Sequence, residues 1–207
     1  FTHAAHQDFL GRAATAAELT AWSNSIDQGD ELEASRYALV TELSLRDEWT
    51  EQIIEIMYQD TFGRSADAEG RRFWIDQLRS GRTVASVAAN FYSSPEYLAR
   101  HGDNITLWVE DLYVQLLDRP AEGDGLTWWV EQVDLAGEGA VAFELYQSDE
   151  SARARVQALY AKLLDRSPDA GGQAFWAEQL RGTGNDLGLA AELASSGEYF
   201  TRAAAAR

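Results

Sequence analysis

The sequence contains no cysteine, only one lysine, and no apolar run that approaches the roughly 20 residues of a membrane-spanning helix. Without cysteine, the chain has no disulfide scaffold, no thiol catalysis and no thiolate-bound metal. Basic residues are also scarce: 17 Lys and Arg face 34 Asp and Glu, which gives a formal net charge of −17. Because a phosphate backbone requires clustered cations, this charge argues against nucleic acid as a partner. We also expect no membrane insertion.

The remaining composition is that of a folded protein. Hydrophobic residues make up 45% and aromatic residues 11% of the 207 residues, which excludes disorder despite the charge. Lys162 is the single lysine, and a carboxylate-rich surface of this kind suits an extracellular or saline setting, although a genome rich in G and C would also replace lysine by arginine. The chain begins at Phe1 without a charged-then-apolar leader, so we expect a processed or excised piece whose targeting signal lies elsewhere.

The most informative feature is an internal repeat. Four segments carry a Leu/Phe–Gly/Asp–Arg run followed, ten residues after the Arg, by a Trp. The Arg and Trp pairs are Arg12 and Trp22, Arg64 and Trp74, Arg119 and Trp129, and Arg166 and Trp176. We therefore predict one repeat domain over residues 1–207, with copies at approximately 1–50, 51–103, 104–152 and 153–207.

Each copy is predicted to be a set of short helices. Apolar residues recur at helical spacing up to the Arg, and a capping signal such as Thr15-x-x-Glu18 begins a second helix. Asp67 and Asp169 occupy the same capping position, and Glu122 is a weaker cap there. Since no alternating strand pattern extends beyond a few residues, the fold is predicted to be all-α.

Three finer expectations concern the arrangement of these helices. The second helix is expected to end at glycine in every copy, at Gly29, Gly81, Gly137 and Gly182. Its buried stripe is expected to hold both aromatic residues and the apolar residue four positions after the Trp, as in Phe73, Trp74 and Leu78, then Trp128, Trp129 and Val133, then Phe175, Trp176 and Leu180. The copies are expected to form one body, in which two pairs of copies meet near Gly102–Asn104.

The runs Tyr58–Gly81 and Tyr160–Gly182 resemble the bacterial domain-of-unknown-function family 4214. The shared pattern is a Leu-Leu-Gly-Arg helix end, an Asp-Pro-x-Gly loop, a Trp-x-x-Gln-Leu helix and a Ser-x-Glu-Tyr or Phe end. More remotely, it is similar to the linker polypeptides of cyanobacterial phycobilisomes. The resemblance implies a module of secreted or cell-surface bacterial proteins, and it supplies no catalytic residues.

The repeated polar residues are the candidate binding residues. A cation at a helix end meets unpaired carbonyls, so a structural role is expected for the repeated Arg, which could also bind Glu96 or Glu198. A Gln one turn after a buried Trp is expected to hydrogen-bond a loop carbonyl. A pocket of Arg, Gln and loop backbone for a glycan is the alternative. It would use Arg64, Gln77, Arg119, Gln132, Arg166 and Gln179.

The spaced acids in the loops offer a calcium alternative, although calcium requires six to eight oxygens and each loop supplies about two acids. These acids are Asp67, Glu69, Glu122, Asp124 and Asp169. His3 and His6 could share a helix face, but no third metal ligand is evident beside them. Helix capping is the preferred role of the acids, and no metal or cofactor is predicted.

The sequence thus favours a non-catalytic helical repeat module that acts as a spacer or docking domain. We expect a protein partner in a secreted or cell-surface bacterial protein, and the oligomeric state stays open. A cell-wall or matrix glycan is the alternative ligand. An enzyme is not predicted, because the chain lacks nucleophile, phosphate-loop and metalloprotease motifs.

Overall fold

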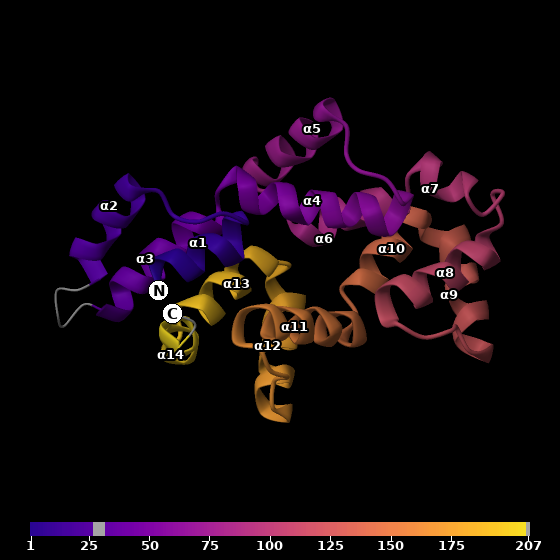
Figure 1. Cartoon of the computed structure of the whole chain (residues 1–207). Helices are drawn as coiled ribbons and strands as arrows, with labels where there is room; N and C mark the ends of the chain where they lie inside the picture. The colour runs from indigo at the N-terminus through magenta and orange to yellow at the C-terminus, as the bar shows by residue number, and fades with distance from the viewer. Residues whose placement is uncertain (27–31, 206–207) are drawn as a thin grey trace.

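A computed structural model describes residues 1–26 and 32–205, and within these ranges the chain forms helices and loops with no strand. The predicted all-α fold is confirmed. In chain order the helices are α1 (Thr2–Leu10), α2 (Ala16–Ile26), α3 (Leu32–Ser44), α4 (Asp47–Phe62), α5 (Ala68–Arg79), α6 (Val84–Tyr92), α7 (Pro95–Ala99), α8 (Ile105–Leu117), α9 (Gly123–Ala136), α10 (Glu138–Tyr146), α11 (Asp149–Leu164), α12 (Ala170–Thr183), α13 (Asp186–Ser195) and α14 (Gly197–Ala205) (Figure 1).

The predicted capping residues begin the helices as expected. In the capping box of α2, Glu18 accepts the Thr15 N–H at 2.8 Å and the Thr15 hydroxyl accepts the Glu18 N–H at 3.3 Å. The Asp67 carboxylate accepts two N–H groups of α5, and Asp169 accepts the Gly172 N–H of α12. Glu122 precedes α9 without a side-chain cap hydrogen bond, so it is the weaker cap that its residue type predicts.

The predicted glycine stops hold at two of the four positions. Helix α9 ends at Gly137, and α5 ends just before Ser80 and Gly81. The stop at Gly182 is wrong, because α12 runs through it to Thr183 and ends at Gly184, which adopts the left-handed conformation. Gly29 lies outside the described residues.

The junctions between the predicted copies differ from one another. Between α7 and α8 the chain turns through Gly102 and Asp103, both at positive φ, so a short separate helix stands at this junction. The other two predicted boundaries, after residues 50 and 152, contain no such turn. They fall inside the continuous helices α4 and α11.

Buried side chains form two hydrophobic clusters. The inner cluster is built from residues between Ile54 and Tyr146, and α6 packs extensively on α10 within it. The terminal cluster is built from residues 1–49 and 152–203, where α3 packs on α13. Figure 1 shows the consequence: the two ends of the chain lie side by side, with α1 and α3 near α13 and α14.

The expected pairing of copies is therefore wrong. The second predicted copy packs on the third, and the first packs on the fourth, so residues 102–104 lie within one half rather than between halves. At the terminal contact, the Phe1 ring meets Tyr199 at 5.7 Å, and the Tyr199 hydroxyl donates to Asp8 at 2.7 Å.

Within residues 1–26 and 32–205, none of the helices combines the length and the apolar character that crossing a membrane requires.

Candidate functional site

The repeated arginines hold the ends of their own segments together. Arg119 binds Glu150 through two hydrogen bonds, of 2.6 and 2.9 Å, and equivalent two-point contacts join Arg64 to Glu96 and Arg166 to Glu198. The guanidinium of Arg119 lowers the pKa of Glu150. The expected contacts with Glu96 and Glu198 are confirmed, and they occupy these arginines with structural partners.

The repeated glutamines behave differently from expectation. No hydrogen bond joins the side chain of Gln77, Gln132 or Gln179 to another described residue. The expected bond to a loop carbonyl is therefore wrong, since none of the three amides makes one within the described residues. Gln77 and Gln132 are partly buried and Gln179 is exposed.

The acids of the calcium alternative lie around helix starts. Asp67 and Asp169 use carboxylate oxygens to cap α5 and α12, while Glu69 and Asp124 lie in first helical turns. Across the described residues, no three His, Asp or Glu side chains gather closely enough to hold a metal ion. His6 is buried in α1 and His3 is exposed, so these two side chains do not converge.

The aromatic residues of the second helices divide into an inner and an outer set. Trp74 and Trp129 are partly buried against the inner cluster, and Trp22 and Trp176 against the terminal cluster. Trp49 and Trp108, which lie outside the second helices, are buried. The outer set, by contrast, consists of Phe73, Trp128 and Phe175, each of which is half exposed. Placing these three in the core was wrong, because adjacent positions lie about 100° apart around a helix and only one of the two can face the cluster.

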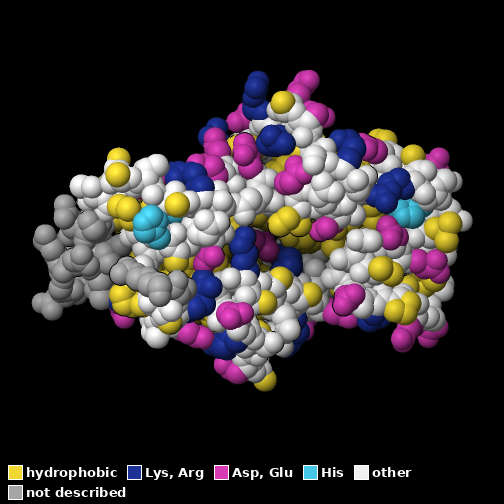
Figure 2. All heavy atoms as spheres, in the orientation of Figure 1, with side chains coloured by type: hydrophobic (Ala, Val, Ile, Leu, Met, Phe, Trp, Pro, Cys, Tyr) yellow, Lys and Arg dark blue, Asp and Glu magenta, His cyan; other side chains and the backbone are white. Residues whose placement is uncertain are grey.

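A groove of about 410 Å³ opens between α4 and α11, where the two clusters meet. In Figure 2 it is the hollow near the centre of the face in view, with hydrophobic atoms on its rim. One wall is formed by residues of α4, namely Trp49, Ile53, Ile56, Met57 and Asp60. The opposite wall is formed by residues of α11, namely Ser151, Ala154, Arg155, Ala158, Leu159 and Lys162. Residues of α6, α8, α10 and α13 close the floor.

Both walls are stripes at helical spacing. On α4 the residues recur three or four positions apart, which is the pattern by which one helix packs on another. Ile56 is nevertheless 56% exposed, and Ala154 and Ala158 of the facing stripe are exposed as well. The small alanines leave room between the walls, so an apolar helical surface faces solvent on each side of the groove.

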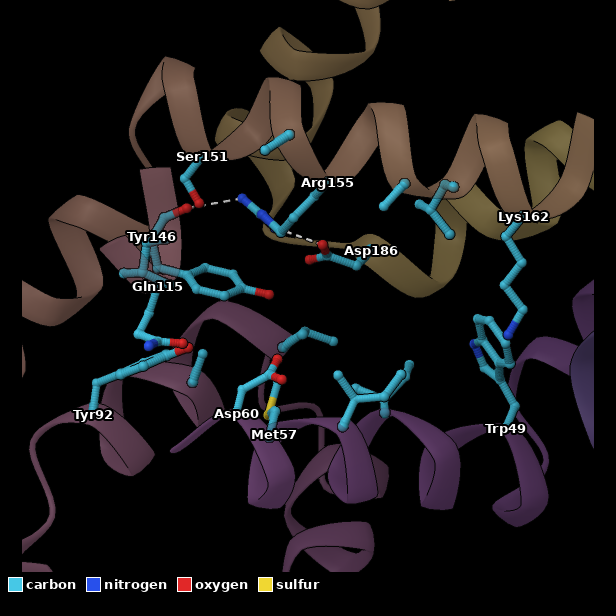
Figure 3. Close-up of a pocket in the computed structure, with 18 residues that line it drawn as sticks. Trp49, Met57, Asp60, Tyr92, Gln115, Tyr146, Ser151, Arg155, Lys162 and Asp186 are labelled. Atoms are coloured by element: carbon cyan, nitrogen blue, oxygen red, sulfur yellow. Dashed lines mark hydrogen bonds and ion pairs between the residues drawn. The ribbon is translucent and has the colours of Figure 1, made fainter. Parts of the chain in front are cut away.

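The groove is polar at its ends (Figure 3). At one end the Lys162 ammonium lies 4.3 Å from the centre of the Trp49 ring. Toward the other end Asp60 approaches Tyr92 and Tyr146, and no hydrogen bond or ion pair joins Asp60 to another described residue. Burial raises the pKa of Asp60 and lowers the pKa of Lys162, so each group would gain from a partner of opposite charge.

Arg155 in the groove wall takes part in an ion pair within its own half and in a hydrogen bond to the other half. Arg155 binds Asp186 of α13 at 2.5 Å and donates to the Tyr146 carbonyl of α10 at 2.9 Å. The Arg155 guanidinium also lies over the Tyr146 ring at 4.1 Å. One Asp186 oxygen and the Arg155 Nε are buried without a partner.

Comparison with protein families identifies two stretches of the chain. The model of the domain of unknown function DUF4214 matches residues 40–101 and 139–202, which together make up more than half of the sequence. The chain belongs to the DUF4214 family. No curated protein and no solved structure gives a significant match.

The groove lies between the two DUF4214 segments. Helices α4 and α6 belong to the first matched segment, while α10, α11 and α13 belong to the second. Of the candidate residues, Arg119, Gln132, Glu122 and Asp124 lie outside both segments.

Sequence reasoning did not find the groove. Its two walls come from α4 and α11, which are far apart in the sequence, and their apolar pattern is the same as that of buried positions. One signal was available: the only lysine of the chain lies in this groove. A second signal was the presence of small residues, Ala154 and Ala158, opposite the apolar stripe of α4.

Proposed function

We propose that the chain is a non-catalytic docking module of four tandem helical copies, at approximately 1–50, 51–103, 104–152 and 153–207, and that its groove binds a helical segment of a partner protein. In this proposal the module belongs to a secreted or cell-surface bacterial protein. The observation that carries the proposal is the pair of facing apolar stripes on α4 and α11, which no helix of the described chain covers.

The chemistry of the groove indicates the kind of segment that fits. Its length from Trp49 to Asp60 is about 16 Å, which accommodates about three turns of helix. Apolar residues on one face of that helix would pack on Ile53 and Ile56, as in other complexes where a helix lies in a groove. The net charge of −17 and the unpaired Asp60 favour a segment that carries Lys or Arg.

The ends of the groove also predict the direction of the bound helix. The positive N-terminal end of a helix dipole is stabilised by a carboxylate and the C-terminal end by a cation. Asp60 would therefore lie near the N-terminus of the segment and Lys162 near its C-terminus. The segment would run parallel to α11 and antiparallel to α4.

The repeated Arg–Glu contacts support the non-catalytic part of the proposal. Three copies use the same two-point pairing, and a single active site would instead distinguish one copy from the others. The acidic composition and the family resemblance support an exported location.

A defined peptide tests the docking proposal. The probe is a fluorescent amphipathic peptide of about 15 residues with Leu on one face and Lys and Arg on the other, long enough to fill the groove. Binding is measured by fluorescence anisotropy for the wild-type chain and for Ile56→Asn, which removes an exposed apolar contact without changing the charge. We expect the Kd of Ile56→Asn to rise at least about fivefold, which corresponds to about 1 kcal/mol.

Two controls separate docking from nonspecific attraction. Leu135→Asn changes an exposed leucine on α9, away from the groove, and should bind the peptide as the wild type does. A scrambled peptide of the same composition keeps the charge but loses the apolar face, and it should bind more weakly. Equal binding of the scrambled peptide, or an Ile56→Asn variant with wild-type affinity, would contradict the proposal.

A further inference from the structure

Three aromatic rings recur on the outer surface at equivalent positions of the second helices. Phe73 on α5 is 52% exposed, Trp128 on α9 is 50% exposed and Phe175 on α12 is 53% exposed. Isolated exposed aromatic residues are common, but the same exposed ring in three copies calls for a shared explanation. Packing does not provide one, because the Trp that follows each ring already fills the contact with the cluster.

Each outer ring is held in place by that inner Trp. The ring centres are 4.9 Å apart for Phe73 and Trp74, 4.5 Å for Trp128 and Trp129, and 4.8 Å for Phe175 and Trp176, always edge to face. An aromatic side chain fixed in this way loses little conformational freedom when a ligand stacks on it. The outer rings are therefore ready-made flat platforms.

The same two polar groups follow each platform one helical turn later. A carboxylate stands three positions on and a Gln four positions on, as in Asp76 and Gln77 after Phe73. The other pairs are Glu131 with Gln132 and Glu178 with Gln179. Residues three and four apart share a helix face, so each ring has an acceptor and an amide beside it. The amides have no hydrogen-bond partner within the described chain.

A ligand with a flat apolar face and hydroxyl groups around its edge would match the aromatic ring, the carboxylate and the amide of each site. A pyranose ring offers C–H groups that stack on an aromatic ring and neighbouring hydroxyls that bond to a carboxylate and an amide. The overall charge of −17 disfavours anionic sugars such as uronates or sulfated chains. A neutral sugar is therefore the ligand that the ring, the acid and the amide fit together.

The placement of the three helices favours a polymer over a single sugar or a protein surface. Each of these helices packs mainly on the helices before and after it, so that α5 lies on α4 and α6, α9 on α8 and α10, and α12 on α11 and α13. Figure 1 shows them projecting on different sides of the molecule, with α5 at the top, α12 at the bottom and α9 at the right. Separate small sites cannot form one continuous protein interface, whereas a repetitive polysaccharide presents the same unit to each.

We propose that the aromatic–acid–Gln faces of α5, α9 and α12 are three equivalent binding sites for neutral polysaccharide, separate from the docking groove. Because the three helices project on different sides, each site would bind its own stretch of polymer. Helix α2 has Ala21 at the equivalent position and lacks the platform, so it is not a fourth site.

Affinity electrophoresis in gels that contain a neutral polysaccharide tests this proposal. The panel is a soluble β-1,4-glucan, a β-1,3-glucan, a galactomannan and an α-glucan, with a polyuronate as the anionic comparison. We expect at least one neutral polymer to retard the wild type and the polyuronate not to. Phe73→Ala, Trp128→Ala and Phe175→Ala should each weaken retardation, and the triple variant should abolish it.

A second set of variants distinguishes sugar binding from general hydrophobic adhesion. Gln77→Leu, Gln132→Leu and Gln179→Leu keep the rings and enlarge the apolar surface, so adhesion would increase while sugar binding would fall. Leu135→Ala removes an exposed leucine of α9 that has no such flank, and it should leave retardation unchanged. Ile56→Asn should also leave retardation unchanged, which separates this test from that of the groove.

The substituted apolar side chains and Gln179 are exposed, and Gln77 and Gln132 are partly buried. An unchanged Tm confirms that the variants fold. The proposal is overturned if no neutral polymer of the panel retards the wild type, if the triple variant is retarded as strongly as the wild type, or if the Gln→Leu variants are retarded more strongly.

Discussion

Glu18 is the most heavily bonded carboxylate of the first copy. It accepts two hydrogen bonds from Arg12, at 3.0 and 2.9 Å, and one from Arg46 at 2.9 Å, in addition to the N–H of Thr15. Arg12 also reaches Glu48 at 3.4 Å, whereas Arg64 and Arg166 bind only a Glu 32 residues later among the described carboxylates. The hydrogen bonds from Arg12 are the main reason why the pKa of Glu18 lies well below its usual value.

The lowered pKa of Glu18 predicts a pH-dependent contribution to stability. A carboxyl group whose pKa is lower in the folded state stabilises the fold above its unfolded pKa of about 4.5, and the contribution is lost as the pH falls toward the folded pKa. We expect Glu18→Gln to cost about 2 kcal/mol at pH 7 and progressively less below pH 4, because charge-assisted hydrogen bonds are lost. Urea unfolding at pH 7 and pH 3 measures the difference. A constant cost across this range would contradict the assignment, and Glu131→Gln on the exposed face of α9 is the control.

The buried ion pair of Arg155 and Asp186 is a second contact between individual residues whose contribution to stability can be tested. Both side chains are mostly buried, with 17% and 12% of their surfaces exposed, so removing one partner leaves a charge without compensation. We expect Arg155→Met to destabilise the fold by about 3 kcal/mol.

The double variant Arg155→Met with Asp186→Leu should recover much of that loss, because two apolar side chains remove both buried charges. Urea unfolding of the wild type, the two single variants and the double variant gives the coupling energy. Additive effects of the two single changes would show that the pair does not act as a unit.

At the scale of the helices, local sequence determined most of what could be predicted. Caps such as Asp67 and Asp169 act within a single turn, so they were readable from residue type and spacing. The end of α12 was not, because Gly182 and Gly184 both permit a helix stop and the packing of the last turn selects between them. The outward turn of Phe73 was not readable either, since two adjacent aromatic residues give no local indication of which one is buried.

The turns that follow α1, α4, α8 and α11 differ in residue type, and this difference can be tested. Gly11 follows α1 and Gly63 follows α4, both in the left-handed conformation. Asp118 after α8 and Asp165 after α11 adopt the same conformation, each with φ 54°. A residue with a Cβ is strained there, and glycine is not. We expect Asp165→Gly to stabilise the fold by about 0.5–1 kcal/mol and Gly63→Asp to destabilise it by a similar amount. Thermal unfolding measures both, and a Tm that falls for Asp165→Gly would refute the explanation.

At the scale of the whole molecule, the sequence indicated repetition but could not indicate which copies pack together. The predicted copies carry similar apolar stripes, so from the sequence any two could bury each other's faces. The choice of α3 with α13 and of α6 with α10 depends on side-chain fit between helices far apart in the sequence. The groove is a consequence of that choice and was unpredictable for the same reason.

The packing of α3 on α13 predicts a long-range effect of a core substitution. Leu39 of α3 is fully buried in the terminal cluster, and Leu112 of α8 is fully buried in the inner cluster. We expect each Leu→Ala change to cost about 3 kcal/mol. In hydrogen exchange, Leu39→Ala should loosen α13, about 150 residues away, while Leu112→Ala should loosen α6 and α10. Loosening of α6 and α10 by Leu39→Ala, with α13 unaffected, would contradict the pairing.

The most direct test of the docking groove uses the absence of cysteine from the chain. A single cysteine introduced as Ala158→Cys on the groove wall, or as Leu135→Cys on α9, can be labelled with an environment-sensitive dye and titrated with the amphipathic peptide. The account predicts a blue shift at position 158 that saturates at one peptide per chain, and no shift at position 135. No shift at position 158, or equal shifts at both positions, would contradict it.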